Sequence, residues 1–214
     1  MKTILIYGDS LVYGKMPKTP KRYERSKNFI GVIEKELGHD YRIIDEGLRA
    51  RTLSGENGFF SYLSGVEQFG PLLESHLPLD FVCIFLGVND CNKKDTKTSE
   101  DVEFALEKYL EEVKTWCESL SIESLPKVMI IVPPAIRGDQ LLLNENMFSI
   151  FGSGAEEKYK ELVSIYQNFC EKYKCVFFDA SKHCVTADEE GIHLDENNNA
   201  LLGVALANKI KEIL

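Results

Sequence analysis

Short runs of apolar residues recur along the chain and alternate with longer stretches in which apolar residues are spaced three or four positions apart. Within the short runs the apolar residues are continuous and do not alternate with polar ones. Continuous runs of this length are typical of parallel β-strands that are covered on both faces of a sheet. They predict strands at residues 3–7, 41–45, 81–86, 128–132 and 175–178.

The stretches between these runs have the spacing of amphipathic helices. The clearest covers residues 99–120, and Thr98 with Asp101 forms the pattern of its N-terminal cap. In residues 64–77, Pro71 is expected to split the helix or to start a new turn. The complete set of predicted helices is residues 27–37, 64–77, 99–120, 156–173 and 199–214.

This order of elements predicts the α/β class. Five strand–helix steps favour a doubly wound parallel sheet, which is a three-layer α/β/α architecture with helices on both faces. We expect a flavodoxin-like strand order and one domain over residues 1–214. A chain of 214 residues, 44% of them hydrophobic, is long and apolar enough for the core of such a domain.

The net charge indicates which binding partners are disfavoured, and the cysteine content indicates the redox state of the compartment. The net charge of −9 disfavours binding to nucleic acid or to an anionic membrane surface. Six cysteines occur without a CxxC pair, so we expect a reduced, cytoplasmic setting. The N-terminal apolar run is too short for a signal peptide, and no run approaches the length of a membrane span.

Reactive residue types follow the predicted strands at the places where each strand ends. The first strand ends in Gly8-Asp9-Ser10-Leu11, the third in Gly87-Val88-Asn89-Asp90, and residues 188–194 precede the last helix. In an open parallel sheet these loops share one edge, where ligands bind. A hydroxyl, a carboxamide, a histidine and carboxylates therefore meet there, and these are the groups that acyl transfer needs.

Each of these motifs has a structural explanation when it is taken alone. Gly-Asp-Ser can be a turn with a helix cap, and Asn-Asp pairs commonly form turns. A single histidine is more often structural, as expected for His39, His76 and His183. We expect Asp90 to brace its loop, and Arg49 and Arg51 to be solvated unless they meet an anionic substrate. The order of the motifs along the chain is what favours a serine hydrolase.

The motifs resemble those of the SGNH, or GDSL-type, hydrolase family over the whole length of the chain. Gly8-Asp9-Ser10-Leu11 is similar to its first motif, Gly87-Val88-Asn89-Asp90 to its Gly-x-Asn-Asp motif, and Gly191-Ile192-His193-Leu194 to its Asp-Gly-x-His-Leu motif. The resemblance implies that Ser10 is the nucleophile and His193 the base. It also implies an oxyanion hole formed by Ser10, Ala50 and Asn89, with Ala50 standing where the family usually has glycine.

The acidic residue departs from the family pattern. The position three before His193 is Glu190, not aspartate, and Asp188 lies five before. A glutamate can accept the Nδ1–H bond of an imidazole, but its side chain is one methylene longer. Glu190 is the preferred third member of the triad, and Asp188 is the alternative acid.

Several stretches resemble the arylesterase or acyltransferase branch, including residues 46–52 and 177–180. That branch implies a homo-oligomer, a small-molecule ester as substrate, and hydrolysis or transacylation without a metal or other cofactor. A carbohydrate O-deacetylase, a thioesterase or a lysophospholipase has the same machinery and remains an alternative. A catalytically inactive binding domain is the alternative of another class, supported by Glu190 alone. Residues 147–154 are predicted to form a glycine-containing loop. This loop packs in the core, forms a wall of an apolar acyl pocket or contacts another subunit.

Overall fold

The computed structural model describes residues 1–55 and 61–214, and within these ranges the chain forms a parallel sheet of five strands. The strand order is β2-β1-β3-β4-β5, which is the flavodoxin-like order that the sequence predicts. All neighbouring strands pair in parallel. The strands are β1 (Lys2–Gly8), β2 (Tyr41–Gly47), β3 (Phe81–Phe85), β4 (Lys127–Val132) and β5 (Val176–Asp179).

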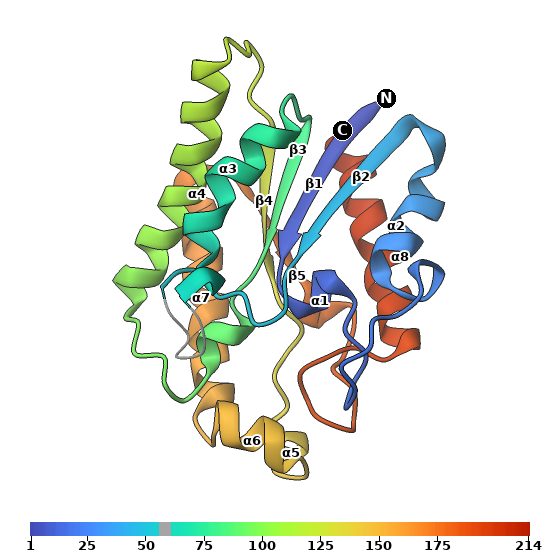
Figure 1. The fold of residues 1–214 in the computed structure, drawn as a ribbon, viewed down its shortest axis with the longest axis vertical. Coiled ribbons are helices and arrows are strands. Elements are labelled where there is room, and N and C mark those ends of the chain that lie inside the picture. Colours follow the sequence, from blue (N-terminus) through green and yellow to red (C-terminus); the bar gives the residue numbers. More distant parts are fainter. Residues whose placement is uncertain (56–60) are drawn as a thin grey trace.

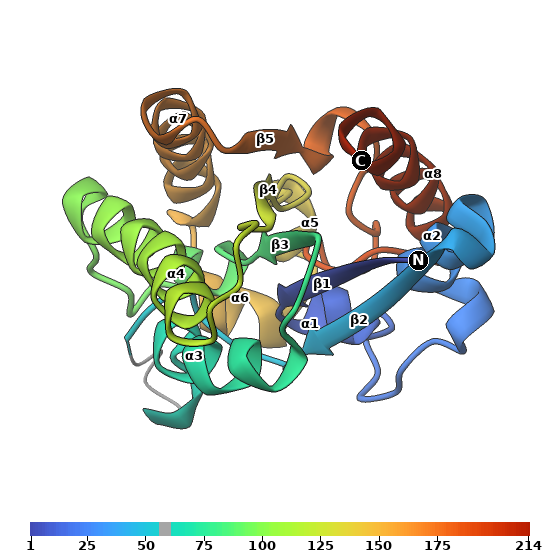
Figure 2. The ribbon, with the colours of Figure 1, turned by 90° about the horizontal axis from the view of Figure 1, so that it is seen from above.

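Helices cover both faces of the sheet, as Figure 2 shows from above. On one face lie α3 (Gly65–His76), α4 (Ser99–Ser119) and α7 (Ala155–Tyr173), and on the other lie α2 (Phe29–Leu37) and α8 (Glu196–Ile213). Short helices lie toward the end to which the strand arrows point in Figure 1. They are α1 (Ser10–Tyr13), α5 (Gly138–Leu141) and α6 (Glu145–Phe151).

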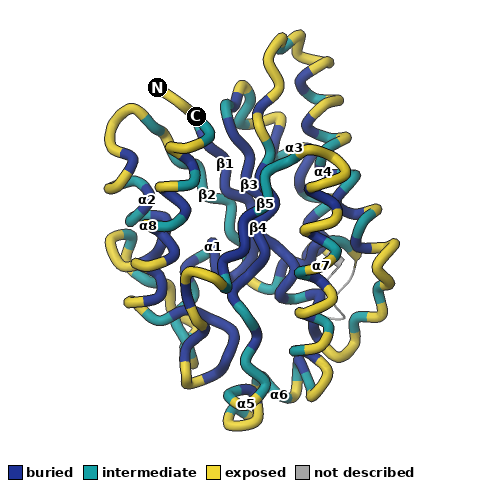
Figure 3. Tube along the Cα trace, turned by 180° about the vertical axis from the view of Figure 1, so that it is seen from behind, coloured by how far each residue is buried: buried dark blue, intermediate teal, exposed yellow. Residues whose placement is uncertain are grey.

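The continuous apolar runs explain the two-sided core. Successive residues of a strand point to opposite faces, so a continuous run supplies both layers. In β1, Leu5 and Tyr7 pack on the side of α3, α4 and α7, whereas Ile4 and Ile6 pack on the side of α2 and α8. All four side chains are buried, and Figure 3 shows β1, β3 and β4 mostly in the colour of buried residues, whereas β2 at the edge of the sheet is intermediate.

Two local expectations differ from the structure. Pro71 does not split its segment, because α3 continues through it with Phe69 and Leu73 buried on either side. Residues 145–151 form the helix α6 instead of a loop. The Asn144 side chain accepts the Met147 N–H at 3.1 Å, and Gly152 ends the helix with a φ of 72°.

None of the helices in the two described ranges combines the length and the apolar character that crossing a lipid bilayer requires.

Candidate active site

The turn after β1 places Ser10 at the carboxyl edge of the sheet. Asp9 caps α1 by accepting the Leu11 N–H at 2.9 Å, so Ser10 becomes the first residue of this short helix. A Cβ at Gly8 would lie 2.6 Å from the carbonyl oxygen of Phe85, so glycine is needed for the close approach of the strand ends. The Ser10 hydroxyl oxygen lies 2.9 Å from Nε2 of His193.

His193 comes from the loop between β5 and α8, and that loop is tied to its neighbours by backbone hydrogen bonds. Ala187 N–H donates to the carbonyl of His193 at 2.7 Å, and Arg137 N–H donates to Gly191 at 3.1 Å. The Nδ1 atom of His193 is hydrogen bonded to Oε1 of Glu190. The carboxylate can only accept, so Nδ1 carries the proton and Nε2 is free to accept one from Ser10.

Glu190 is fully buried and is held from several directions. Its Oε1 also accepts the His193 backbone N–H at 3.2 Å. Its Oε2 accepts the Lys18 backbone N–H at 2.9 Å and lies 3.8 Å from the Lys15 ammonium. These contacts fix the longer side chain of glutamate at the position where it meets the imidazole.

Asp188 lies elsewhere. Its side chain is 83% exposed and is ion-paired with Arg137. The structure therefore brings Glu190 to His193, while Asp188 points to solvent.

The protonation states of the pair follow from burial and from these contacts. Burial favours the neutral acid at Glu190, but the hydrogen bond and charge of His193, the Lys18 N–H and the Lys15 ammonium outweigh it and hold the pKa at about 2. Burial lowers the pKa of His193 below its ordinary 6.5, and Glu190 opposes that shift only in part. The ring is therefore neutral at pH 7, which is the form that a general base needs.

Ala50 and Asn89 lie beside Ser10, and all three residues line the same cavity. Ala50 follows β2 with a φ of 64°, in the left-handed region that glycine adopts most readily. Asn89 belongs to the 3-10 turn Val88–Cys91, and its Nδ2 donates to the Arg51 carbonyl at 2.9 Å and to Oδ2 of Asp9 at 3.3 Å. Burial raises the pKa of Asp9 to about 7. The loops after β1, β2 and β3 are thereby bonded to one another at the cavity.

Arg51 is neither solvated nor directed at a substrate, which corrects the sequence-based expectation. It is buried, and its Nη1 donates to the carbonyl of Gly8 at 2.7 Å and to that of Glu46 at 2.5 Å. Its guanidinium lies 4.1 Å from the centre of the Tyr7 ring. Arg51 thus joins the ends of β1 and β2. Arg49, by contrast, is exposed at the cavity rim.

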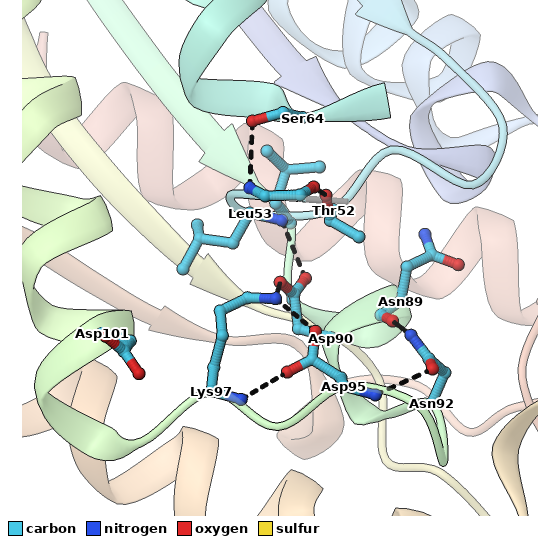
Figure 4. A network of polar contacts seen from close by, with 12 residues as sticks. Thr52, Leu53, Ser64, Asn89, Asp90, Asn92, Asp95, Lys97 and Asp101 are labelled. Atoms are coloured by element: carbon cyan, nitrogen blue, oxygen red, sulfur yellow. Dashed lines mark hydrogen bonds and ion pairs between the residues drawn. The ribbon is translucent and has the colours of Figure 1, made fainter. Parts of the chain in front are cut away.

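A polar network around Asp90 and Lys97 braces the same loops (Figure 4). Oδ2 of Asp90 accepts the Leu53 N–H at 2.8 Å, which ties the loop after β3 to the loop after β2. The Lys97 ammonium lies 3.2 Å from Oδ1 of Asp90 and also pairs with Asp95. The expectation that Asp90 braces its loop is confirmed, and Lys97 supplies the opposite charge that a buried carboxylate requires.

The cavity has a volume of about 390 Å³ and is lined mainly by apolar side chains. The helix α6 contributes Met147, Ile150 and Phe151, so the segment that the sequence left open between core, pocket wall and subunit contact is a wall of this cavity. Within residues 1–55 and 61–214, no group of three His, Cys, Asp or Glu side chains is placed to hold a metal ion. The cavity is suited to a small, partly apolar molecule that reaches Ser10.

The sequence gives no indication that Lys15, Lys18 and Lys97 belong to the site. Their side chains or N–H groups act on Glu190 or Asp90 only because of how the loops fold. Lysines are common at surfaces, so no spacing in the sequence distinguishes these three.

Together the parallel α/β sheet and the Ser10–His193–Glu190 cluster at its carboxyl edge have the arrangement of serine hydrolases. The chain belongs to the GDSL-like lipase/acylhydrolase family, whose model matches residues 4–206. The fold is that of the SGNH hydrolases, and membership of this family makes the protein a carboxylic ester hydrolase.

Solved structures agree with this assignment. The aryl esterase of M. smegmatis is 33% identical, with a TM-score of 0.91 and full coverage of both chains. A carbohydrate acetylesterase from Sinorhizobium meliloti is 32% identical, with a TM-score of 0.90 and full coverage of both chains. Curated protein sequences include no match to this chain.

The strained backbone at Ala50 leads to a stability prediction. Replacing Ala50 with glycine is expected to stabilise the protein by about 0.5–1 kcal/mol, because glycine adopts a positive φ without steric cost. Urea unfolding of the two proteins measures the difference. A matched Ala207→Gly variant in α8 is expected to be destabilised, since there glycine replaces alanine in a helix. A loss of stability in Ala50→Gly would contradict the strain at this position.

Proposed function

We propose that this protein is a serine esterase that hydrolyses short-chain carboxylic esters through a Ser10–His193–Glu190 triad and an acyl-enzyme. The observation that carries the proposal is the chain of buried contacts from the Ser10 hydroxyl to Nε2 of His193, and from Nδ1 of His193 to Glu190. A neutral histidine in this tautomer can take the serine proton, and an ionised carboxylate behind it stabilises the imidazolium that forms.

In the first half of the reaction, the Ser10 oxygen attacks the ester carbonyl while His193 takes its proton. The tetrahedral intermediate collapses, the acyl group stays on Ser10, and His193 gives the proton to the leaving alcohol. In the second half, His193 takes a proton from water as the water oxygen attacks the acyl carbonyl. The acid leaves when the bond to Ser10 breaks, and His193 returns the proton to the Ser10 oxygen. Each step uses the same histidine because Glu190 holds its ring in one orientation.

The backbone N–H groups of Ser10 and Ala50 and the side-chain amide of Asn89 are the proposed oxyanion donors. This assignment is supported by the position of Ala50 and Asn89, which line the same cavity as the nucleophile Ser10. One N–H of Asn89 Nδ2 donates to the Arg51 carbonyl at 2.9 Å, which sets the direction of the amide. The other makes only the longer contact of 3.3 Å to Asp9, which the oxyanion replaces when the substrate binds. Removing one donor of an oxyanion hole costs about 2.7–4 kcal/mol of transition-state stabilisation in comparable sites.

The short-chain preference rests on the size of the cavity and on the wall that α6 forms. Ile150 and Phe151 close the apolar side of the cavity, which suits a small acyl group. Deacetylation of carbohydrates is a second candidate, favoured by the likeness to a carbohydrate acetylesterase. Transfer of the acyl group to an alcohol in place of water belongs to the same proposal, since both use the acyl-enzyme.

The alternative of an inactive binding domain rested on glutamate at position 190. Glu190 reaches His193 and is held there by Lys15 and Lys18, so the substitution leaves the triad geometry in place. This contact supports the esterase proposal over an inactive domain.

The nucleophile and base lead to the first activity prediction. Ser10→Ala and His193→Ala are each expected to lower kcat for p-nitrophenyl acetate by at least about 10⁴-fold, because the remaining groups cannot replace either function. Circular dichroism of both variants should match the wild type. Turnover near the wild-type rate in either folded variant would refute the triad.

The third member of the triad is tested by a pair of variants. Glu190→Ala is expected to lower kcat by about 10²–10⁴-fold, because the imidazole loses its orienting acceptor. Asp188→Ala serves as the matched control and should stay within about twofold of wild type, since this exposed carboxylate pairs with Arg137. A larger loss of kcat in Asp188→Ala than in Glu190→Ala would identify Asp188 as the acid of the triad instead.

The pH dependence of kcat/KM is the third test. His193 acts as a base only when neutral, so activity should be complete above its pKa and fall as pH drops through it. The midpoint of this acid limb is expected below 6.5, because burial lowers the pKa of His193. A midpoint above 6.5 would contradict the lowered pKa of His193.

A further inference from the structure

A second cavity opens beside the catalytic one and has a volume of about 460 Å³. The two cavities share Lys15, Arg49 and Met147 in their linings. A molecule whose ester group lies at Ser10 can therefore extend from one into the other. We call this second cavity the annex. Its lining includes the charged residues Lys15, Lys18, Arg49 and Glu190 and the polar residues Thr19, Asn144 and Asn146.

The annex is cationic although the whole chain carries a net charge of −9. Its lining holds the cationic side chains of Lys15, Lys18 and Arg49 against the carboxylate of Glu190. That carboxylate is fully buried and already bonded to His193. Positive charge is thus in excess at this place, and a cleft lined by one sign of charge concentrates ligands of the opposite sign.

Lys18 and Arg49 lie in the lining of the annex, and no ion pair neutralises either charge within the described residues. Lys18 has a φ of 55°, and its backbone N–H donates to Glu190 at 2.9 Å, which fixes the backbone of this residue in the lining of the annex. The Arg49 guanidinium lies 5.6 Å from the centre of the Tyr13 ring. Among the residues that the structure describes, neither side chain is ion-paired with a carboxylate.

We propose that the annex binds an anionic group, a carboxylate or a phosphate, on the alcohol part of the ester substrate. This inference rests on the proposed function. His193 protonates the leaving alcohol, so the alcohol part lies on the side of His193 and Glu190, where the annex opens. The acyl part lies against the apolar wall of Ile150 and Phe151. The natural substrate is thus an ester of a short acid with an anionic alcohol.

The test compares two aryl acetates that differ in charge, 4-acetoxybenzoate and its methyl ester. The ratio of their kcat/KM values is measured for the wild type and for Lys18→Met/Arg49→Met. The double variant is expected to lower the anionic-to-neutral ratio by about fivefold, because two exposed charge contacts are removed. Any effect of the double variant on the chemistry at Ser10 cancels in this ratio, because both esters are hydrolysed at the same site. Lys15 is left in place because its ammonium lies 3.8 Å from Glu190, whereas Lys18→Met keeps the backbone N–H that donates to Glu190.

A control variant, Lys114→Met/Lys211→Met, removes the same charge from the exposed surfaces of α4 and α8 and should leave the ratio unchanged. In the wild type, the preference for the anion should weaken as salt screens the exposed charges. Benzoate and phenyl phosphate are then compared as inhibitors of methyl-ester turnover, which distinguishes a carboxylate site from a phosphate site. The group bound in the annex is that of the anion whose inhibition weakens in Lys18→Met/Arg49→Met.

An unchanged ratio in Lys18→Met/Arg49→Met would overturn the anionic subsite while the esterase assignment stands. If neither benzoate nor phenyl phosphate inhibited the wild type, the anionic subsite would also be overturned. Absence of methyl-ester turnover in the wild type would instead overturn the esterase proposal itself, so the two failures are distinguishable.

Discussion

Parallel pairing of strands that are buried on both faces is the constraint on which this site depends. It sends the loops after β1, β2 and β3 to one edge of the sheet, where the loop before α8 joins them. Ser10 and His193 lie 183 positions apart in the chain and meet there at 2.9 Å. Arg51 and Asp90 then bond these loops to one another, so the distances among the reactive groups are set by the scaffold before any ligand arrives.

The buried carboxylate of Glu190 shows how the site accommodates a departure from its family. A charge without contact to water is costly unless hydrogen bonds and opposite charges compensate it. Glu190 receives N–H groups from His193 and Lys18 and faces the Lys15 ammonium. These contacts both stabilise the charge and fix the longer side chain. A glutamate can therefore hold the imidazole as an aspartate would, because the segment of Lys15 and Lys18 folds over it.

The sequence predicted the layers, the strand order and the motif residues because each depends on local pattern or on a family motif. Continuous apolar runs identify buried parallel strands, and Ser10, Asn89 and His193 follow those strands at the expected edge. Features that depend on how irregular loops fold were not predictable. They include the burial of Arg51, the helix α6 in place of a loop, and the contacts of Lys18. The positive φ of Ala50 belongs to the same group, since alanine gives no signal of it.

The central claim is that Ser10 is a nucleophile activated by His193, and covalent trapping tests it most directly. The wild-type protein is treated with a fluorophosphonate, and the site of the adduct is identified by mass spectrometry of its peptides. We expect one adduct, on Ser10, whose formation is lost in His193→Ala because the base that activates the hydroxyl is missing. A wild-type protein that remains unlabelled at Ser10, or one labelled at another residue, would contradict it.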